Sequence, residues 1–149
     1  MAEQGKICSF FGHSEIQISH DLQEKTFLEI QHAIQCGCRI FLFGGFGMFD
    51  ALCYKIVSAL QKDNPSLALK RVFCVPQERY LRKKAPFFQK EDYDETVYLS
   101  PAFGGWYKSI YFRNCAMIDK SDYVIFYAEK RENSGAYKAY AYASKKRKK

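Results

Sequence analysis

Three short glycine-bearing segments stand where predicted strands end and helices begin, positions at which a backbone can bind a ligand directly. The first is Gly12-His13-Ser14, the second begins at Gly44, and the third is Ser134-Gly135-Ala136 before the last predicted helix. Glycine permits backbone conformations closed to other residues and keeps a Cβ out of a ligand's way. We therefore expect these segments to border one binding site.

The second segment, Gly44-Gly45-Phe46-Gly47-Met48-Phe49-Asp50, is the most informative of the three. A helix that follows such a loop directs unpaired N–H groups and its positive dipole end toward it, which favours phosphate. The segment has neither the Gly-Lys-Ser/Thr of a Walker loop nor a Gly-x-Gly-x-x-Gly fingerprint. Two interpretations stay open: these residues bind phosphate, or the glycines serve only a tight strand-to-helix turn. The candidate ligands from this segment are Gly44, Gly45, Gly47, Met48 and Asp50.

Two polar side chains on a later predicted helix could complete the site. Arg113 and Asn114 are read either as a phosphate clamp or as a surface cation beside a polar helix residue. His13, an isolated histidine after a strand, is by itself more often structural.

The elements that must position these residues alternate in type. Continuous apolar runs predict strands that are buried on both faces, at 7–11, 39–43, 69–75, 122–127 and, more briefly, 96–99. Apolar residues at helical spacing predict helices at 21–35, 50–60, 107–118 and 136–143. The economical arrangement is an α/β, Rossmann-like fold with a mostly parallel sheet and helices on both faces. Such sheets bind ligands at the carboxyl ends of their strands.

Length and charge limit the class of protein. A chain of 149 residues fits one domain, at 1–144, and the basic tail at 145–149 supplies five of the charges behind the net +7. Such a tail predicts weak, nonspecific contact with polyanions. No apolar run is long enough to span a membrane, and the N-terminus lacks the apolar core of a signal peptide. We expect a cytoplasmic protein without membrane contact.

The six cysteines could suggest disulfides or a metal. Most of them lie inside apolar segments, where a free thiol behaves as a small hydrophobic side chain. The one close pair, Cys36-Gly37-Cys38, is too tightly spaced for an ordinary zinc knuckle. We therefore expect buried reduced thiols, no metal site and no cofactor.

Taken in order, the motifs resemble the SLOG superfamily, the Rossmann-like domains related to DprA and the LOG phosphoribohydrolases, and within it small YpsA-like proteins. The motifs run from 7 to 143 and are Gly12-His13, Gly44 to Asp50, Arg113-Asn114-x-x-Met117-Ile118-Asp119, Ser121 to Ile125, and Ser134-Gly135-Ala136. The resemblance implies a nucleotide pocket with the Gly44 segment along the phosphate and Arg113 in the place of an arginine of active LOG enzymes. Relatives often form dimers, so a homodimer is the implied assembly.

The chain departs from that pattern where catalysis would occur. Ser14 stands where YpsA-like proteins usually have arginine, and Ser134 stands where they have glycine. Active LOG enzymes place a glutamate just inside the helix after the last glycine loop, where this chain has Ala139, and no acidic residue follows Ser134. Cleavage of an N-glycosidic bond needs a carboxylate beside the anomeric carbon. The resemblance therefore points away from that enzymatic activity.

Three functions follow. The leading hypothesis is a binding or sensing domain for a nucleotide or a nucleotide-derived small molecule. The alternative is a nucleotide or nucleoside hydrolase or transferase with a relocated carboxylate, for which the candidates are Glu15, Asp50, Asp119 and Asp122. The third is nucleic-acid binding of the DprA type, aided by the basic tail.

Overall fold

The structure is a computed structural model that describes residues 5–12, 16–45, 47–75, 90–98, 106–127 and 135–145. Within these ranges, five parallel strands form one sheet in the order β4-β3-β2-β1-β5. The strands are β1 (Lys6–Gly12), β2 (Cys38–Phe43), β3 (Lys70–Val75), β4 (Glu95–Tyr98) and β5 (Tyr123–Tyr127). The expected α/β, Rossmann-like fold is confirmed.

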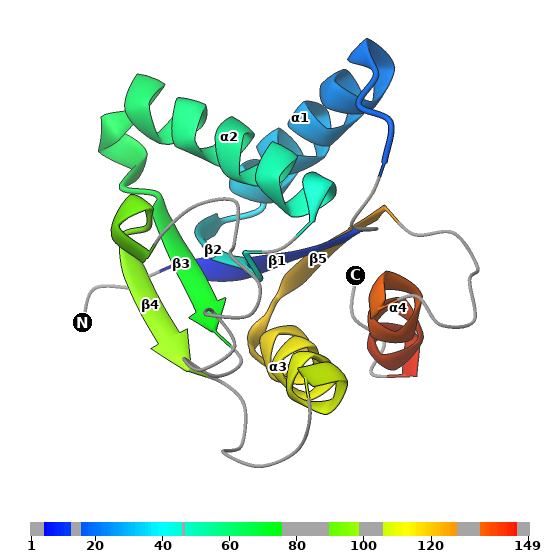
Figure 1. Cartoon of the computed structure of the whole chain (residues 1–149). Coiled ribbons are helices and arrows are strands. Elements are labelled where there is room, and N and C mark those ends of the chain that lie inside the picture. The colour runs from blue at the N-terminus through cyan, green and yellow to red at the C-terminus, as the bar shows by residue number, and fades with distance from the viewer. Residues whose placement is uncertain are drawn as a thin grey trace.

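Helices cover both faces of the sheet (Figure 1). Helices α1 (His20–Gln35) and α2 (Met48–Asp63) lie on one face, and α3 (Trp106–Lys120) and α4 (Gly135–Lys145) lie on the other. Right-handed crossovers explain this split, because the chain steps from β1 to β3 toward one edge and returns from β4 to β5 at the other. The winding therefore reverses between β1 and β5, where a doubly wound sheet has its ligand crevice.

Alternating side chains give the sheet one apolar core on each face. Cys8, Phe41 and Phe73 belong to the core under α1 and α2, whereas Leu42 and Met117 belong to the core under α3 and α4. Because both faces are covered, the strands read as continuous apolar runs.

The helix ends follow local signals. Ser19 Oγ accepts a hydrogen bond from the Leu22 N–H at 3.0 Å and caps α1. Helix α2 begins two residues before the predicted start, directly after Gly47, whose φ of +100° suits glycine. Lys145, assigned to the basic tail by its charge, is the last residue of α4. The rest of the tail lies outside the described residues.

Short 3-10 turns complete the described chain, at η1 (Pro65–Leu67) and η3 (Lys90–Asp92). All six cysteines are free, and five of them are buried; Cys36, at the end of α1, is exposed. No helix among the described residues is both long and apolar enough to cross a membrane.

Candidate functional site

The centre of the candidate site is a carboxylate that holds the loop between β2 and α2. Asp50, in the first turn of α2, accepts hydrogen bonds from the Gly44 N–H through Oδ1 and from the Gly45 N–H through Oδ2, both at 3.0 Å. The side chain of Asp50 is buried. These two N–H groups, expected to face a ligand phosphate, are therefore bound by the protein's own anion.

Two of the predicted site glycines make room for aromatic rings. At Gly45, where φ is +86°, a Cβ would overlap the ring of Phe73. At Gly12 a Cβ would overlap the ring of Phe49, which stacks on Tyr127 at 5.7 Å between ring centroids. Because Phe49 and Phe73 occupy the space beside these glycines, the geometry at both positions fits a tightly packed turn.

Arg113 is buried, and its guanidinium joins three elements. Its Nη1 donates to the carbonyl oxygens of Gly44 and Cys74, each at 2.9 Å, and its Nε donates to Asn114 Oδ1 at 3.0 Å. Arg113 thus links α3 to the carboxyl ends of β2 and β3. The alternative of a surface cation is wrong, because Arg113 is only 4% exposed. Burial lowers the pKa of Arg113, and the Cys74 thiol and Asp50 oppose that shift.

Several donors at this edge of the sheet keep no partner within the described residues. Arg113 Nη2 donates no hydrogen bond there, and it would lie 3.0 Å from a Cβ on Gly44. The N–H groups of Met48 and Phe49 open α2, and Gly47 provides no side-chain cap for them. All of these groups attract anions.

Asp50 is the most strongly perturbed acid of this site. Burial raises the pKa of Asp50 from 3.8 to about 6, although the Gly44 N–H, Arg113 and the Gly45 N–H each favour the charged form. A carboxyl group with a pKa near neutrality can exchange a proton under physiological conditions. Burial likewise raises the pKa of the neighbouring Cys74 thiol to about 12, which keeps it protonated.

The structure brings together only part of the predicted site. Gly44, Gly45, Asp50, Arg113 and Asn114 are connected by hydrogen bonds. Gly47 and Met48 continue the same loop into α2, and Gly12 ends the neighbouring strand β1. Gly135 and Ala136 open α4, which covers the other face of the sheet (Figure 1). His13, Ser14 and Ser134 lie outside the described residues.

Ala139, at the position matched to the LOG glutamate, is fully buried in the core between α4 and the sheet. A carboxylate could not be hydrated at this position, and an ionised one would be costly to bury. In the described part of the chain, no group of three His, Cys, Asp or Glu side chains could hold a metal ion.

Sequence reasoning overlooked the aromatic residues behind the loop. Tyr93 packs its ring against Phe73 at 4.8 Å between centroids, and its buried hydroxyl has no hydrogen-bond partner within the described residues. Burial, followed by the charge of Asp50, raises the pKa of Tyr93. The burial of Arg113 did have a sequence signal, because Arg113 precedes the buried Met117 by four residues on the inner stripe of α3.

Comparisons with known proteins support the fold. No family model and no curated protein matches the sequence. Three similar solved structures each align with 96% of this chain. The structural genomics target TM1055 has a TM-score of 0.60 and 14% identity, and the alignment covers 71% of its chain. DNA processing protein A (DprA) from Streptococcus pneumoniae has a TM-score of 0.59, 12% identity and 48% of its chain covered, and DprA from Helicobacter pylori has a TM-score of 0.60, 15% identity and 62% of its chain covered. The last was solved to describe its single-stranded DNA binding mode. This chain thus spans less than two thirds of either DprA chain, and it shares the Rossmann-like fold of TM1055 and DprA.

Proposed function

We propose that this chain is a binding module for a nucleotide or a nucleotide-derived small molecule, with the ligand phosphate at the start of α2. The observation that carries the proposal is a set of donors at the carboxyl edge of the sheet that have no partner among the described residues: Arg113 Nη2 and the N–H groups of Met48 and Phe49. A buried guanidinium and a helix N-terminus both favour a negatively charged group.

The phosphate position differs from the one expected from the sequence. Asp50 already accepts from the N–H groups of Gly44 and Gly45. A phosphate beside these groups would meet a carboxylate, which repels it when ionised. The proposed contact therefore shifts along the loop to Gly47, Met48 and Phe49.

Met48 allows a direct test, because it is the first residue of α2 after the N-cap Gly47. Proline is well tolerated at this position and lacks the N–H. Met48→Pro should keep the fold and weaken nucleotide binding, whereas Met48→Ala removes only the side chain and should bind normally. Calorimetric titration of both variants and the wild type with mono- and diphosphate nucleotides measures the difference. Nucleotide binding that is equal in the two variants, or absent from the wild type, would contradict the proposal.

The proposal also includes the superfamily, the domain bounds, the assembly and the cellular location of the chain. It places the chain in the SLOG superfamily near the YpsA-like proteins, with a ligand-sensing domain at 1–144 that forms homodimers in the cytoplasm. The fold similarity to TM1055 and DprA is compatible with this placement at 12–15% identity. Size-exclusion chromatography with light scattering tests the dimer.

A hydrolase or transferase acting on nucleotides is the second candidate, and Asp50 favours it. The pKa of Asp50, raised to about 6 by burial, suits a group that exchanges protons near neutral pH. Both oxygens of Asp50 already accept an N–H, which favours a role in holding the loop. Incubation with nucleotides and nucleosides followed by chromatography distinguishes the enzyme from the binding module, because only an enzyme releases free base.

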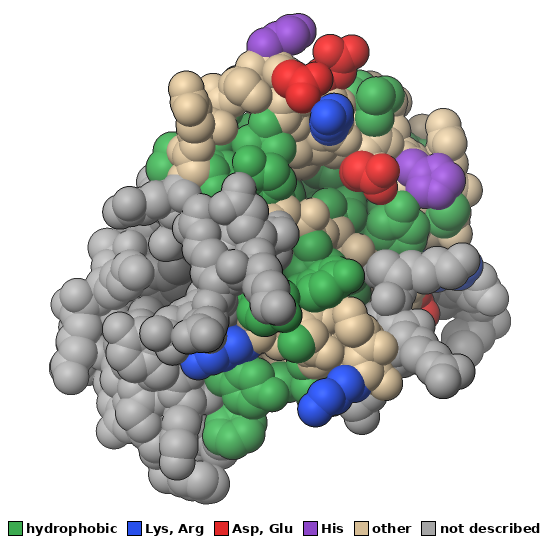
Figure 2. All heavy atoms as spheres, turned by 90° about the vertical axis from the view of Figure 1, so that its right-hand side faces the viewer, with side chains coloured by type: hydrophobic (Ala, Val, Ile, Leu, Met, Phe, Trp, Pro, Cys, Tyr) green, Lys and Arg blue, Asp and Glu red, His purple; other side chains and the backbone are tan. Residues whose placement is uncertain are grey.

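Nucleic-acid binding is the third candidate, supported by exposed aromatic side chains near the edge strand β5. Tyr140 on α4 is 48% exposed, and its ring lies 5.3 Å from that of Phe126 on β5. Exposed aromatic rings can stack on unpaired bases. In Figure 2, hydrophobic side chains extend below α1, and most of the acidic side chains in this view gather over α1 itself. Salt-dependent retention on single-stranded DNA tests this candidate.

A further inference from the structure

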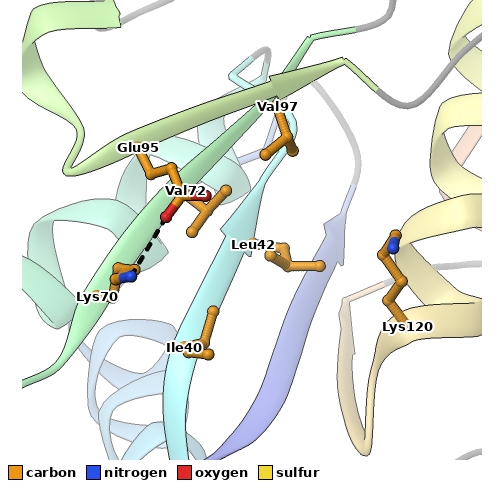
Figure 3. A pocket seen from close by; sticks show the side chains of 7 residues that line it. All are labelled: Ile40, Leu42, Lys70, Val72, Glu95, Val97 and Lys120. Carbon is orange, nitrogen blue, oxygen red and sulfur yellow. Dashed lines mark hydrogen bonds and ion pairs between the residues drawn. The ribbon is translucent and has the colours of Figure 1, made fainter. Parts of the chain in front are cut away.

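A pocket lies on the face of the sheet covered by α3 and α4, and it begins at the amino-terminal ends of β3 and β4. It has a volume of about 170 Å³ and lies between the sheet and the end of α3 (Figure 3). Two of its residues, Lys70 and Glu95, are the first residues of β3 and β4. None of its lining residues belongs to the proposed nucleotide site, although Leu42 lies two residues before Gly44 and Lys120 shares α3 with Arg113. Its lining is Ile40, Leu42, Lys70, Val72, Glu95, Val97 and Lys120.

The floor of the pocket is aliphatic. Leu42 and Val72 are buried, and Ile40 and Val97 are half-buried, all on the face shared with α3 and α4. An apolar cavity of about 150 Å³ lined by similar side chains is large enough for benzene. This floor therefore suits a hydrocarbon group of about six carbon atoms.

The charges at the rim are unequal. Lys70 and Glu95 form an ion pair at 3.3 Å on one side of the pocket. Lys120 reaches the pocket from the last turn of α3 and has no ion pair or hydrogen bond with any described residue. Figure 3 shows the four aliphatic side chains between Lys120 and the Lys70–Glu95 pair. Among the described residues, Lys120 thus places one unpaired positive charge beside an apolar floor.

We propose that this pocket binds a small free monocarboxylate whose body is a branched aliphatic or phenyl group. The body covers Ile40, Leu42, Val72 and Val97, and the carboxylate pairs with the Lys120 ammonium. A neutral molecule of the same shape leaves Lys120 without a partner. A dianion brings a second charge close to Glu95, and inorganic phosphate gains nothing from the aliphatic floor.

The test compares 4-methylpentanoate with its neutral amide, 4-methylpentanamide. Calorimetric titration of the full chain gives the affinity, and the methyl NMR signals of Leu42, Val72 and Val97 locate the bound molecule. We expect the acid to bind about tenfold tighter than the amide, since a charged hydrogen bond is formed only by the acid.

Two lysine variants isolate the role of the charge. Lys120→Met keeps most of the aliphatic stem and should abolish the preference for the acid. Lys62→Met is the matched control, because Lys62 is the basic residue in the last turn of α2 and lies outside the pocket. The control should bind like the wild type.

A third variant tests the location. Val97→Phe fills the floor from the edge strand β4 and should weaken both compounds, and its melting curve shows whether the fold is kept. The proposal is overturned if the wild type does not bind the acid at millimolar concentration, if acid and amide bind equally, or if Lys120→Met leaves the preference intact. Binding of a peptide with a C-terminal leucine but not of the free acid would overturn it as well.

Discussion

Arg113 donates a hydrogen bond from Nη1 to the carbonyl oxygen of Gly44, so a residue of α3, the helix on the opposite face from α2, fixes its guanidinium at the end of β2. The same nitrogen also donates to Cys74 at the end of β3. The arginine proposed to hold an anion is therefore also part of the scaffold, and only its Nη2 is open within the described residues.

Removing this guanidinium should destabilise the fold. Arg113→Ala leaves the buried carbonyl oxygens of Gly44 and Cys74 without their donor, and we expect unfolding to become easier by about 3 kcal/mol. Chemical denaturation measures the loss. Arg39→Ala is the matched control, because Arg39 Nη1 also donates to two carbonyl oxygens, those of Ile34 and Cys38, from a half-buried position. Water can donate to these two carbonyl oxygens in place of the Arg39 guanidinium, so the free energy of unfolding of the control should fall by only about 1 kcal/mol. Equal losses would contradict the buried role of Arg113.

The conformation of Gly45 leads to a second prediction. Alanine at Gly45 adopts an unfavourable positive φ and also displaces the Phe73 ring, so Gly45→Ala should cost about 3 kcal/mol. Gly37 has a φ of +107°, but a Cβ there meets only the Lys6 side chain, at 3.6 Å. Gly37→Ala should therefore cost about 1 kcal/mol, which is the backbone term alone. If urea denaturation gives both variants the same cost, Phe73 does not restrict Gly45.

Local and periodic signals predicted the fold, because each acts through neighbouring residues. Ser19 caps α1 by bonding three residues ahead, and the apolar runs mark strands that are covered on both faces. The candidate site depends on contacts between distant residues. The hydrogen bond from Arg113 to Gly44 joins residues 69 positions apart. A charged residue on a helix is normally expected to be exposed, and only its position on the apolar stripe of α3 indicates that Arg113 is buried.

The side chains that pack beside the glycines could not be predicted either, because they also come from distant parts of the sequence. A glycine after a strand predicts that another group lies close to the backbone. The sequence does not show whether that group is a ligand or an aromatic ring of the protein itself. At Gly45 the ring of Phe73 does so, from the neighbouring strand β3. Only the pairing of β2 with β3 brings these two residues together.

Thiol reactivity gives a third prediction. Cys36 is the exposed cysteine, at the C-cap of α1, and the other five are buried. Burial also raises the pKa of Cys53 and of Cys74, which reduces their thiolate fraction. We expect one thiol per native chain to react quickly with a disulfide reagent, and Cys36→Ser to remove that reaction. Rapid labelling of several thiols in the folded protein would show that the core opens readily.

The last prediction concerns the pH dependence of stability. Burial raises the pKa of Asp50 from 3.8 to about 6, so the folded state disfavours the charged carboxylate. The stability that this group contributes is complete below pH 3.8 and is lost as the pH rises to about 6 and beyond. The full difference corresponds to about 3 kcal/mol. Asp50→Asn should be less stable overall, because an amide can accept only one of the two N–H groups with its oxygen, and it should lack this pH dependence.

The measurement is the free energy of unfolding of the wild type minus that of Asp50→Asn across this pH range. We expect the difference to fall as the pH rises. Asp94 provides the opposite case: burial would raise its pKa, but hydrogen bonds from Arg71 and Gln61 outweigh burial and lower it. The stability contributed by Asp94 is lost as the pH falls, so the same subtraction with Asp94→Asn should rise with pH. If the Asp50 difference also rises with pH, Asp50 is held in the fold as a stabilised anion, and the proposed proton exchange at this site is wrong.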